Sequence, residues 1–216
     1  MASKGENSAE LEDAHRDARA APRITLLLRV GKLVLDGGEY PCVLRDASSS
    51  GIRIRLFCPL TPSTQYQIEL GSGARFTLEP VWERDGEAGF RFREGPVDLG
   101  LMLEEPRQFP KRHLRLRLRR PVPIRIMADG SRLPGLLHDI SQQGARVETG
   151  PGLALQQPVV LELPARPAIR ARLRWRRQAD HGLVFARGFQ LGELAALITQ
   201  LQTLTTDQPA IPAQIG

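Results

Sequence analysis

Cysteine is scarce in this 216-residue sequence, and long apolar runs are missing. The two cysteines, Cys42 and Cys58, lack the spacing of metal ligands and are too few for a disulfide framework, so we expect reduced, buried thiols. No run approaches the roughly 18 apolar residues of a membrane-spanning helix. The polar stretch 1–13 also lacks the apolar segment of a secretion signal. These absences predict a cytoplasmic protein with no membrane span.

Catalytic motifs are missing as well. The sequence has no H-E-x-x-H pair, no Walker phosphate loop and no G-x-S-x-G nucleophile turn. His138-Asp139 is a dipeptide that metal-dependent phosphohydrolases use, but those enzymes need further His and Asp ligands, and only His15, His113 and His181 remain. We therefore expect no enzymatic activity, no metal site and no cofactor.

Aromatic residues are few, at 5%, whereas positive charge is plentiful and unevenly placed. Residues 107–177 contain 16 Lys and Arg against 4 Asp and Glu, a net charge of +12, while the whole chain carries +6. A basic half of this kind favours an anionic partner, which can be a nucleotide, a nucleic acid or an anionic lipid surface. Arginines on the solvated faces of strands would give the same composition.

An internal repeat organises the sequence. The pattern D-x-S-x-x-G occurs at 46–51 and again at 139–144, an offset of 93 residues. Three further pairs have the same offset: Trp82 and Trp175, Gly89 and Gly182, and Phe92 and Phe185. A short motif recurs easily by chance, but an ungapped register from this motif to the final phenylalanine does not. The sequence therefore predicts two homologous domains.

Both domains have the period-two pattern of β-strands. Apolar residues alternate with arginines through 114–119 and again through 169–176, which places one kind on each face of a half-buried strand. Turn signals such as Asp36-Gly37-Gly38 and Asp129-Gly130 separate these runs. Many short strands at such spacing predict an all-β protein made of sandwiches or small barrels.

One helix is predicted near the C-terminus. Apolar residues recur there at three- and four-residue intervals: Leu191, Leu194, Leu197, Ile198, Leu201 and Leu204. We expect this amphipathic helix to pack against the end of a barrel. A dimerising or partner-binding helix is the alternative, although the stripe is short for a coiled coil.

Arginine clusters precede each D-x-S-x-x-G motif. Arg23 and Arg115 lie 23 and 24 residues before the motif aspartates, and each has further basic residues upstream. Together with the motif, the tryptophan and the G-x-x-F sequence that ends each domain, this arrangement resembles the PilZ domain family over residues 16–95 and 107–190. The resemblance implies two consecutive six-stranded antiparallel PilZ-type β-barrels and cyclic di-GMP as the ligand. The predicted division is a disordered tail at 1–15, domain 1 at 16–95, a linker at 96–106, domain 2 with the C-terminal helix at 107–204, and a flexible tail at 205–216.

The predicted ligand-binding residues are the motif positions of both domains: Arg19, Arg23, Asp46, Ser48, Gly51, Lys111, Arg112, Arg115, Asp139, Ser141 and Gly144. Arginine can pair with guanine or phosphate through two hydrogen bonds and can stack on a base. Aspartate can accept from guanine N1–H and N2–H, and serine offers a hydroxyl. The glycines allow either a positive φ or a close approach of the backbone to the ligand. Arg53 and Arg146 are expected near the pocket, whereas Trp82 and Trp175 are predicted to be core residues rather than stacking platforms.

The two predicted sites differ in their basic residues. Lys111 stands where the family has its first arginine, and lysine lacks the planar fork that binds guanine; Arg112, one residue out of register, can compensate. A registration on Arg115 and Arg119 restores the arginine spacing but moves the motif into the alternating strand. We favour the registration on Lys111 and Arg115.

These features predict a non-catalytic receptor for cyclic di-GMP that changes conformation on binding and acts on a protein partner. The resemblance implies regulation of motility, polysaccharide or biofilm formation. Two rival interpretations stay open. One is a general nucleic-acid-binding β-barrel; the scarcity of aromatic residues argues against nucleic acid as the partner. The other is a ligand-free scaffold for protein contacts.

Overall fold

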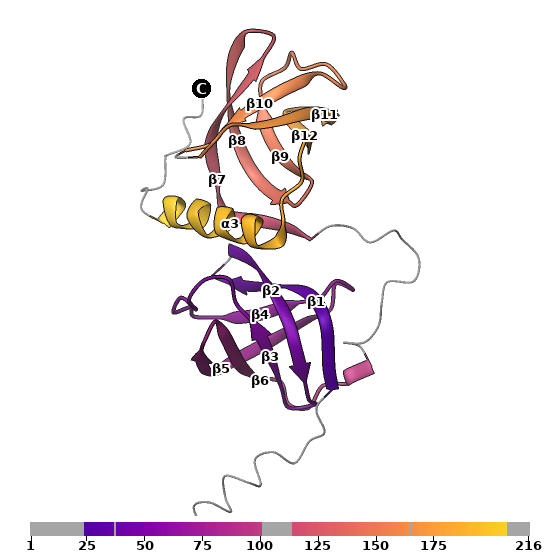
Figure 1. The fold of residues 1–216 in the computed structure, drawn as a ribbon, viewed down its shortest axis with the longest axis vertical. Coiled ribbons are helices and arrows are strands. Elements are labelled where there is room, and N and C mark those ends of the chain that lie inside the picture. Colours follow the sequence, from indigo (N-terminus) through magenta and orange to yellow (C-terminus); the bar gives the residue numbers. More distant parts are fainter. Residues whose placement is uncertain (1–23, 37, 101–113, 165, 207–216) are drawn as a thin grey trace, which may run out of the picture.

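The computed structural model describes residues 24–36, 38–100, 114–164 and 166–206, and these residues form two β-barrels and a C-terminal helix (Figure 1). The strands of barrel 1 are β1 (Ile24–Leu35), β2 (Gly38–Ala47), β3 (Gly51–Arg55), β4 (Tyr66–Glu69), β5 (Arg75–Arg84) and β6 (Glu87–Phe92). They close in the order β1-β2-β3-β6-β5-β4, and every neighbouring pair is antiparallel.

Barrel 2 repeats this architecture. Its strands are β7 (Arg115–Ala128), β8 (Ser131–Ser141), β9 (Gly144–Thr149), β10 (Pro158–Glu162), β11 (Ile169–Arg177) and β12 (Asp180–Phe185). They close in the equivalent order β7-β8-β9-β12-β11-β10. The helix α3 (Leu191–Thr206) follows. The predicted fold, two six-stranded antiparallel barrels with a C-terminal helix, is confirmed.

Alternation of apolar and polar residues fills each barrel from one face of every strand. In β7, Leu116, Ile124 and Ile126 point inward and are buried, while the arginines between them are exposed. The two interiors are separate clusters of mainly aliphatic side chains. Tyr40 packs against both clusters, so it lies where the two barrels meet.

Each barrel has two distinct ends. Tight turns join β1 to β2 and β7 to β8; Asp129 and Gly130 both have positive φ, 45° and 77°, as a two-residue type I′ turn requires. We call the end that carries this turn the hairpin end. The opposite end, where β2 meets β3 or β8 meets β9, carries D-x-S-x-x-G and is called the motif end.

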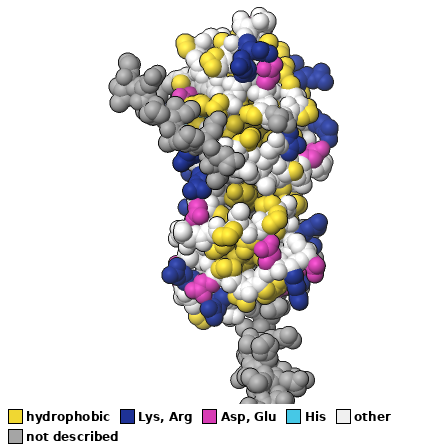
Figure 2. Space-filling view, turned by 90° about the vertical axis from the view of Figure 1, so that its left-hand side faces the viewer, with side chains coloured by type: hydrophobic (Ala, Val, Ile, Leu, Met, Phe, Trp, Pro, Cys, Tyr) yellow, Lys and Arg dark blue, Asp and Glu magenta, His cyan; other side chains and the backbone are white. Residues whose placement is uncertain are grey.

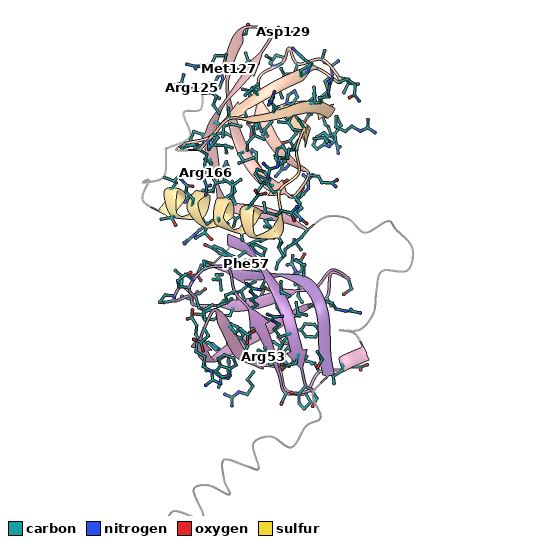
Figure 3. The ribbon with its side chains drawn as sticks, viewed as in Figure 1. Arg53, Phe57, Arg125, Met127, Asp129 and Arg166 are labelled. Atoms are coloured by element: carbon teal, nitrogen blue, oxygen red, sulfur yellow. The ribbon has the colours of Figure 1, made fainter. Side chains whose placement is uncertain are left out.

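The barrels are stacked head to tail. The hairpin end of barrel 1 contacts the first part of β7, where the N–H of Arg117 donates to Glu39 Oε2 of β2 at 2.9 Å. The other two ends face away from this contact: Asp129 lies at the far end of barrel 2, and Arg53 lies in the half of barrel 1 that is remote from barrel 2 (Figure 3). On the face that Figure 2 shows, apolar side chains lie close to the junction, and Lys and Arg side chains lie along the edges of both barrels.

Helix α3 lies between the two barrels (Figure 1). At its start, Glu193 accepts from the N–H of Gln190 at 2.8 Å, which satisfies a backbone donor of the first turn. Its apolar face is buried in the core of barrel 2 through Leu194, Leu197, Ile198 and Leu201. The prediction that the helix packs against a barrel end is therefore confirmed.

The last turns of α3 also reach barrel 1. Gln202 is 3% exposed, and its amide accepts from the N–H of Arg119 at 2.9 Å and donates to the carbonyl of Arg117 at 3.1 Å. A Cβ added at Gly38 of β2 would lie 3.1 Å from Gln202 Nε2. The absence of a side chain at Gly38 thus lets α3, β7 and β2 meet at one point.

Much of the predicted tails and linker lies outside the described residues, which omit 1–23, 101–113 and 207–216. Val97 and Leu99, which the sequence assigns to the linker, pack against the core of barrel 1. Among the described residues, no helix is both long enough and apolar enough to cross a membrane.

Candidate ligand-binding site

A row of residues crosses the outer surface of barrel 2 from β11 to β7. The strand register pairs Trp175 with Gly182, Gly182 with Arg146, Arg146 with Asp139, and Asp139 with Arg117. Residues paired across antiparallel strands share one face of the sheet, so these five positions form a continuous line. An aromatic ring, a bare backbone, a guanidinium and a carboxylate therefore stand side by side.

Barrel 1 contains the same row. Its register pairs Trp82 with Gly89, Gly89 with Arg53, Arg53 with Asp46, and Asp46 with Thr25. The rows differ only in their last member, which is Thr25 in barrel 1 and Arg117 in barrel 2. The sequence repeat thus builds one arrangement twice.

Two arginines hold the carboxylate of Asp139. Arg115 Nη1 donates to Oδ1 at 2.6 Å, and Arg146 Nε donates to Oδ2 at 2.8 Å. The Asp139 side chain is only 6% exposed, whereas that of Arg115 is 45% exposed, so the guanidinium groups lie between the carboxylate and solvent. The hydrogen bond to Asp139 raises the pKa of Arg146 above its ordinary value. The site therefore presents a fixed positive surface over a buried acceptor.

The network around Asp46 in barrel 1 is similar but has an additional arginine. Arg53 Nε donates to Asp46 Oδ2 at 2.6 Å, and Arg53 Nη1 lies 3.4 Å from Glu87 Oε2. Arg45 Nε also donates to Glu87, at 3.1 Å. In barrel 2 the position equivalent to Glu87 is Asp180, whose Oδ1 lies 3.2 Å from Arg146 Nη1. Both barrels thus connect the motif carboxylate to a second acid through one arginine.

The sequence matches one domain family over most of its length. Residues 17–105 match the PilZ domain, and residues 105–205 match it again. The chain belongs to the PilZ family. No curated protein matches the sequence.

Several solved structures are similar to this PilZ chain. PlzA of Borreliella burgdorferi, in complex with c-di-GMP, is 13% identical with a TM-score of 0.34, and the alignment covers 90% of this chain and 98% of PlzA. The Bacillus subtilis inhibitor of motility (MotI/DgrA) is 14% identical with a TM-score of 0.33, covering 85% and 100%. Escherichia coli YcgR, in complex with c-di-GMP, is 15% identical with a TM-score of 0.27, covering 92% and 87%. The family assignment rests on the two domain matches.

The register relates the PilZ arginine segments of the two barrels. Thr25 pairs with Asp46 as Arg117 pairs with Asp139, so Arg115, two residues before Arg117, stands where the sequence of barrel 1 has Arg23. This equivalence agrees with the registration on Lys111 and Arg115.

Four of the predicted ligand-binding residues lie outside the described part of the chain: Arg19, Arg23, Lys111 and Arg112. The ligand-binding role of all eleven residues stays a prediction. The seven others lie at the two motif ends, where Asp139 is joined to Arg115, and Asp46 to Arg53.

The motif serines stabilise the PilZ turn. Ser141 Oγ accepts from the N–H of Gly144 at 3.2 Å and so closes the turn between β8 and β9. In barrel 1, Ser48 Oγ lies 3.1 Å from Ser50 Oγ. Ser48 and Ser141 are both buried, at 6% and 5% exposure, so these contacts occupy at least part of their hydrogen-bonding capacity.

Of the two reasons predicted for the motif glycines, the structure excludes the positive φ, and the close approach to the ligand stays a prediction. Neither Gly51 nor Gly144 has a positive φ. A side chain at either position would collide with a backbone carbonyl of the adjacent strand, that of Phe90 or that of Leu183. The glycines therefore let β3 approach β6, and β9 approach β12, which closes the barrel beside the motif.

The prediction that Trp82 and Trp175 are core residues is wrong. Trp175 is 39% exposed, and Trp82 is partly exposed. A register shift just before each tryptophan turns the indole from the interior to the outer face. A side chain at Gly89 or Gly182 would overlap the indole, so the glycine provides the surface on which the ring lies. In barrel 1 the Arg84 guanidinium carbon is 5.2 Å from the centre of the Trp82 ring.

Proposed function

We propose that this chain is a receptor for cyclic di-GMP, which binds on the outer-face row of one or both barrels. One observation carries the proposal: in each barrel a partly exposed tryptophan, a glycine, an arginine and a buried aspartate lie in one line at the motif end. Membership of the PilZ family supports the choice of ligand.

The chemistry of the row suits a cyclic dinucleotide. Arg115 and Arg146 offer donors to a phosphate or to guanine O6 and N7. An ionised carboxylate has about four lone-pair sites, so Asp139 can accept from a guanine edge while it still binds both arginines. The exposed indole of Trp175 offers a flat surface on which a guanine can stack.

We further propose that binding changes the arrangement of the basic segments at the motif ends and that this change is read by a protein partner in the cytoplasm. The family resemblance supports a role in motility, polysaccharide or biofilm regulation. A non-catalytic receptor of this kind acts through differential affinity for two conformations, since a ligand shifts an equilibrium only by that difference.

Calorimetric titration tests the proposal. The wild-type chain and the variants Arg23→Ala and Arg115→Ala are titrated with cyclic di-GMP, GTP and cyclic AMP. We expect selective binding of cyclic di-GMP, and we expect each variant to remove one class of site, since Arg115 donates to Asp139 and Arg23 is the corresponding residue in the sequence of barrel 1. Binding that neither substitution alters would show that the site is misplaced, and a chain that binds none of the nucleotides would favour the scaffold interpretation.

Nucleic-acid binding is a second candidate, because the outer face of β11 carries exposed arginines at alternate positions: Arg170, Arg172 and Arg174. Their spacing of about 7 Å follows from two strand residues and is similar to that of successive phosphates along a strand of nucleic acid. Titration with duplexes of unrelated sequence distinguishes the two functions. Nucleic-acid binding through phosphates weakens steeply with salt and is insensitive to sequence, whereas the receptor proposal predicts that Arg170→Ala leaves cyclic di-GMP affinity unchanged.

A further inference from the structure

The first part of β7 has backbone groups that no described strand of barrel 2 satisfies on one side. Strand β10 pairs with β7 only from Arg125 to Met127, so residues 115–121 form an open edge there. Buried backbone donors need a partner from elsewhere. The N–H of Arg117 finds one in Glu39 of barrel 1, at 2.9 Å. Barrel 1 thus completes the hydrogen bonding of a strand in barrel 2.

Glu39 is held firmly from its own side. The residue is 5% exposed, and Lys32 Nζ lies 3.2 Å from its Oε2. Lys32 in turn lies 2.8 Å from Glu69 Oε1. A buried carboxylate that is paired with a cation and aimed at an N–H forms a charge-assisted hydrogen bond, which is shorter and stronger than a neutral one. The contact between the barrels is therefore centred on one charged acceptor.

The strand that Glu39 holds also carries the arginine of the site. Arg117 is paired in register with Asp139, and Arg115, two residues earlier, donates to the Asp139 carboxylate. Residues two apart on a strand point to the same face. A displacement of the Arg117 backbone consequently moves the Arg115 guanidinium relative to Asp139.

We propose that Glu39 is a positioning residue for the site in barrel 2, although it belongs to barrel 1 and does not touch the ligand. It fixes the start of β7 so that Arg115 and Asp139 stay in register for cyclic di-GMP, and in this respect the inference rests on the proposed function. By linkage, ligand bound at barrel 2 stabilises the contact between the barrels by the same factor.

We expect the site in barrel 1 to be independent of Glu39. Asp46 lies seven residues further along β2, a path of about 23 Å at the usual rise per strand residue. The two sites of one molecule thus provide their own control: a loss of general stability weakens both, whereas a loss of positioning weakens only the site in barrel 2.

The chain has two tryptophans, one in each row, so each site can be followed by fluorescence. Trp82→Phe leaves Trp175 to report on barrel 2, and Trp175→Phe leaves Trp82 to report on barrel 1. Glu39→Ala removes the acceptor, whereas Glu39→Gln keeps an acceptor oxygen and serves as the conservative rescue. Glu79→Ala is the matched control, because Glu79 is an exposed carboxylate of barrel 1 that pairs with Arg91.

We expect Glu39→Ala to weaken cyclic di-GMP binding reported by Trp175 about tenfold, the effect of losing one hydrogen bond to a charged acceptor. Glu39→Gln is expected to stay within about threefold of the parent, since an amide oxygen still accepts. Glu79→Ala changes neither site, and none of the three changes the affinity reported by Trp82.

Three outcomes separate this inference from the function on which it rests. If Trp175 does not respond to cyclic di-GMP in the Trp82→Phe chain, the proposed function fails for barrel 2 and the inference fails with it. A normal response that Glu39→Ala leaves unchanged overturns the inference alone, and so does an equal weakening of both sites.

A second measurement needs no Glu39 variant. In the wild-type chain, saturation with cyclic di-GMP must slow hydrogen exchange at the Arg117 amide. If binding is seen by calorimetry but this exchange rate does not change, the coupling is absent and the inference is wrong.

Discussion

Barrel 1 and barrel 2 share a strand order and an outer-face row, but they differ in charge. Residues 24–100 contain 9 Lys and Arg and 10 Asp and Glu, a net charge of −1, whereas residues 114–206 contain 14 and 6, a net charge of +8. In barrel 1 many basic groups are matched by acids, as in the pairs Arg75–Glu69 and Arg91–Glu79. The same fold therefore offers a nearly neutral surface in one copy and a strongly basic surface in the other.

The two copies also differ in what lies beside their sites. Asp139 is paired with Arg117, whose N–H reaches barrel 1, while the site around Asp46 and Arg53 lies at the free end of the stack. A duplicated motif thus acquires different properties from different neighbours, although its own residues are nearly unchanged. Four experiments test these differences between the two barrels.

Alkylation of the thiols reports on barrel 1 alone, because both cysteines lie there. Cys42 is fully buried, and burial raises the pKa of its thiol to about 12. The thiolate is the nucleophile, so at neutral pH we expect alkylation of Cys42 to be about 1,000-fold slower than that of an ordinary exposed thiol, rising with pH. Mass spectrometry of iodoacetamide-treated Cys58→Ser measures this rate. Rapid labelling of Cys42 would mean that barrel 1 opens readily.

Removal of the motif aspartates compares the two sites directly. Asp139→Ala frees Arg115 and Arg146 from their shared anchor, and we expect the cyclic di-GMP affinity of barrel 2 to fall about 100-fold, since breaking a buried charge network costs several kcal/mol. Asp46→Ala should do the same to barrel 1. In each variant the other barrel is the control, and calorimetry should count one site fewer. An unchanged stoichiometry in both variants would contradict the site assignment.

The salt dependence of ligand affinity should differ between the two barrels because their net charges differ. Raising the ionic strength from about 0.05 M to about 0.5 M shortens the Debye length severalfold, which weakens the attraction of a dianionic ligand to the basic barrel 2 more than to barrel 1. We expect affinity losses of about tenfold and about threefold, respectively. The single-tryptophan chains measure both. Equal losses would show that net charge does not set the difference.

Acid should affect barrel 1 through Glu69. Burial raises the pKa of this carboxyl, but hydrogen bonds and charge from Lys32 and Arg75 outweigh burial, so its pKa lies below the ordinary value. The stabilisation is present above the unfolded-state pKa and is lost as the pH falls through the folded-state pKa. Between pH 6 and pH 3 the free energy of unfolding should fall less in Glu69→Gln than in the wild type. We expect the difference between the two losses to be less than about 1 kcal/mol. Urea unfolding followed by Trp82 in Trp175→Phe gives this value, and identical acid profiles would exclude the effect.

Local pattern was enough to predict an all-β protein with two homologous domains and a C-terminal helix, while the resemblance to the PilZ family supplied the six-stranded barrels and the pairing of Arg115 with Asp139. Strand alternation is a pattern of adjacent residues, and the 93-residue repeat is found by comparing the sequence with itself. Both can be read from the sequence without knowledge of three-dimensional contacts. Arg53 and Arg146 could also have been placed more firmly: Ile52 and Ala145 point inward, so the next residue must share the outer face with the motif aspartate.

The rest depends on register and on contacts far apart in the sequence. Trp82 and Trp175 follow β-bulges, and one extra residue moves a side chain to the opposite face without any change in composition. The glycines opposite them, Gly89 and Gly182, were the available signal. Glu39 and Gln202 gave no local signal at all, because their partners on β7 are 78 and 85 residues away.

The head-to-tail arrangement of the barrels has a consequence for growth of the stack. Such a contact joins unlike surfaces and does not close on itself, so in principle one barrel after another can be added. In barrel 2, however, the position equivalent to Glu39 is Arg132, which pairs with Met127 as Glu39 pairs with Val34. Arg132 is bound to Glu162 at 3.2 Å and, as a cation, cannot accept an N–H. The hairpin end of barrel 2 therefore lacks, at this position, the acceptor that barrel 1 offers to β7, and it cannot repeat the same contact.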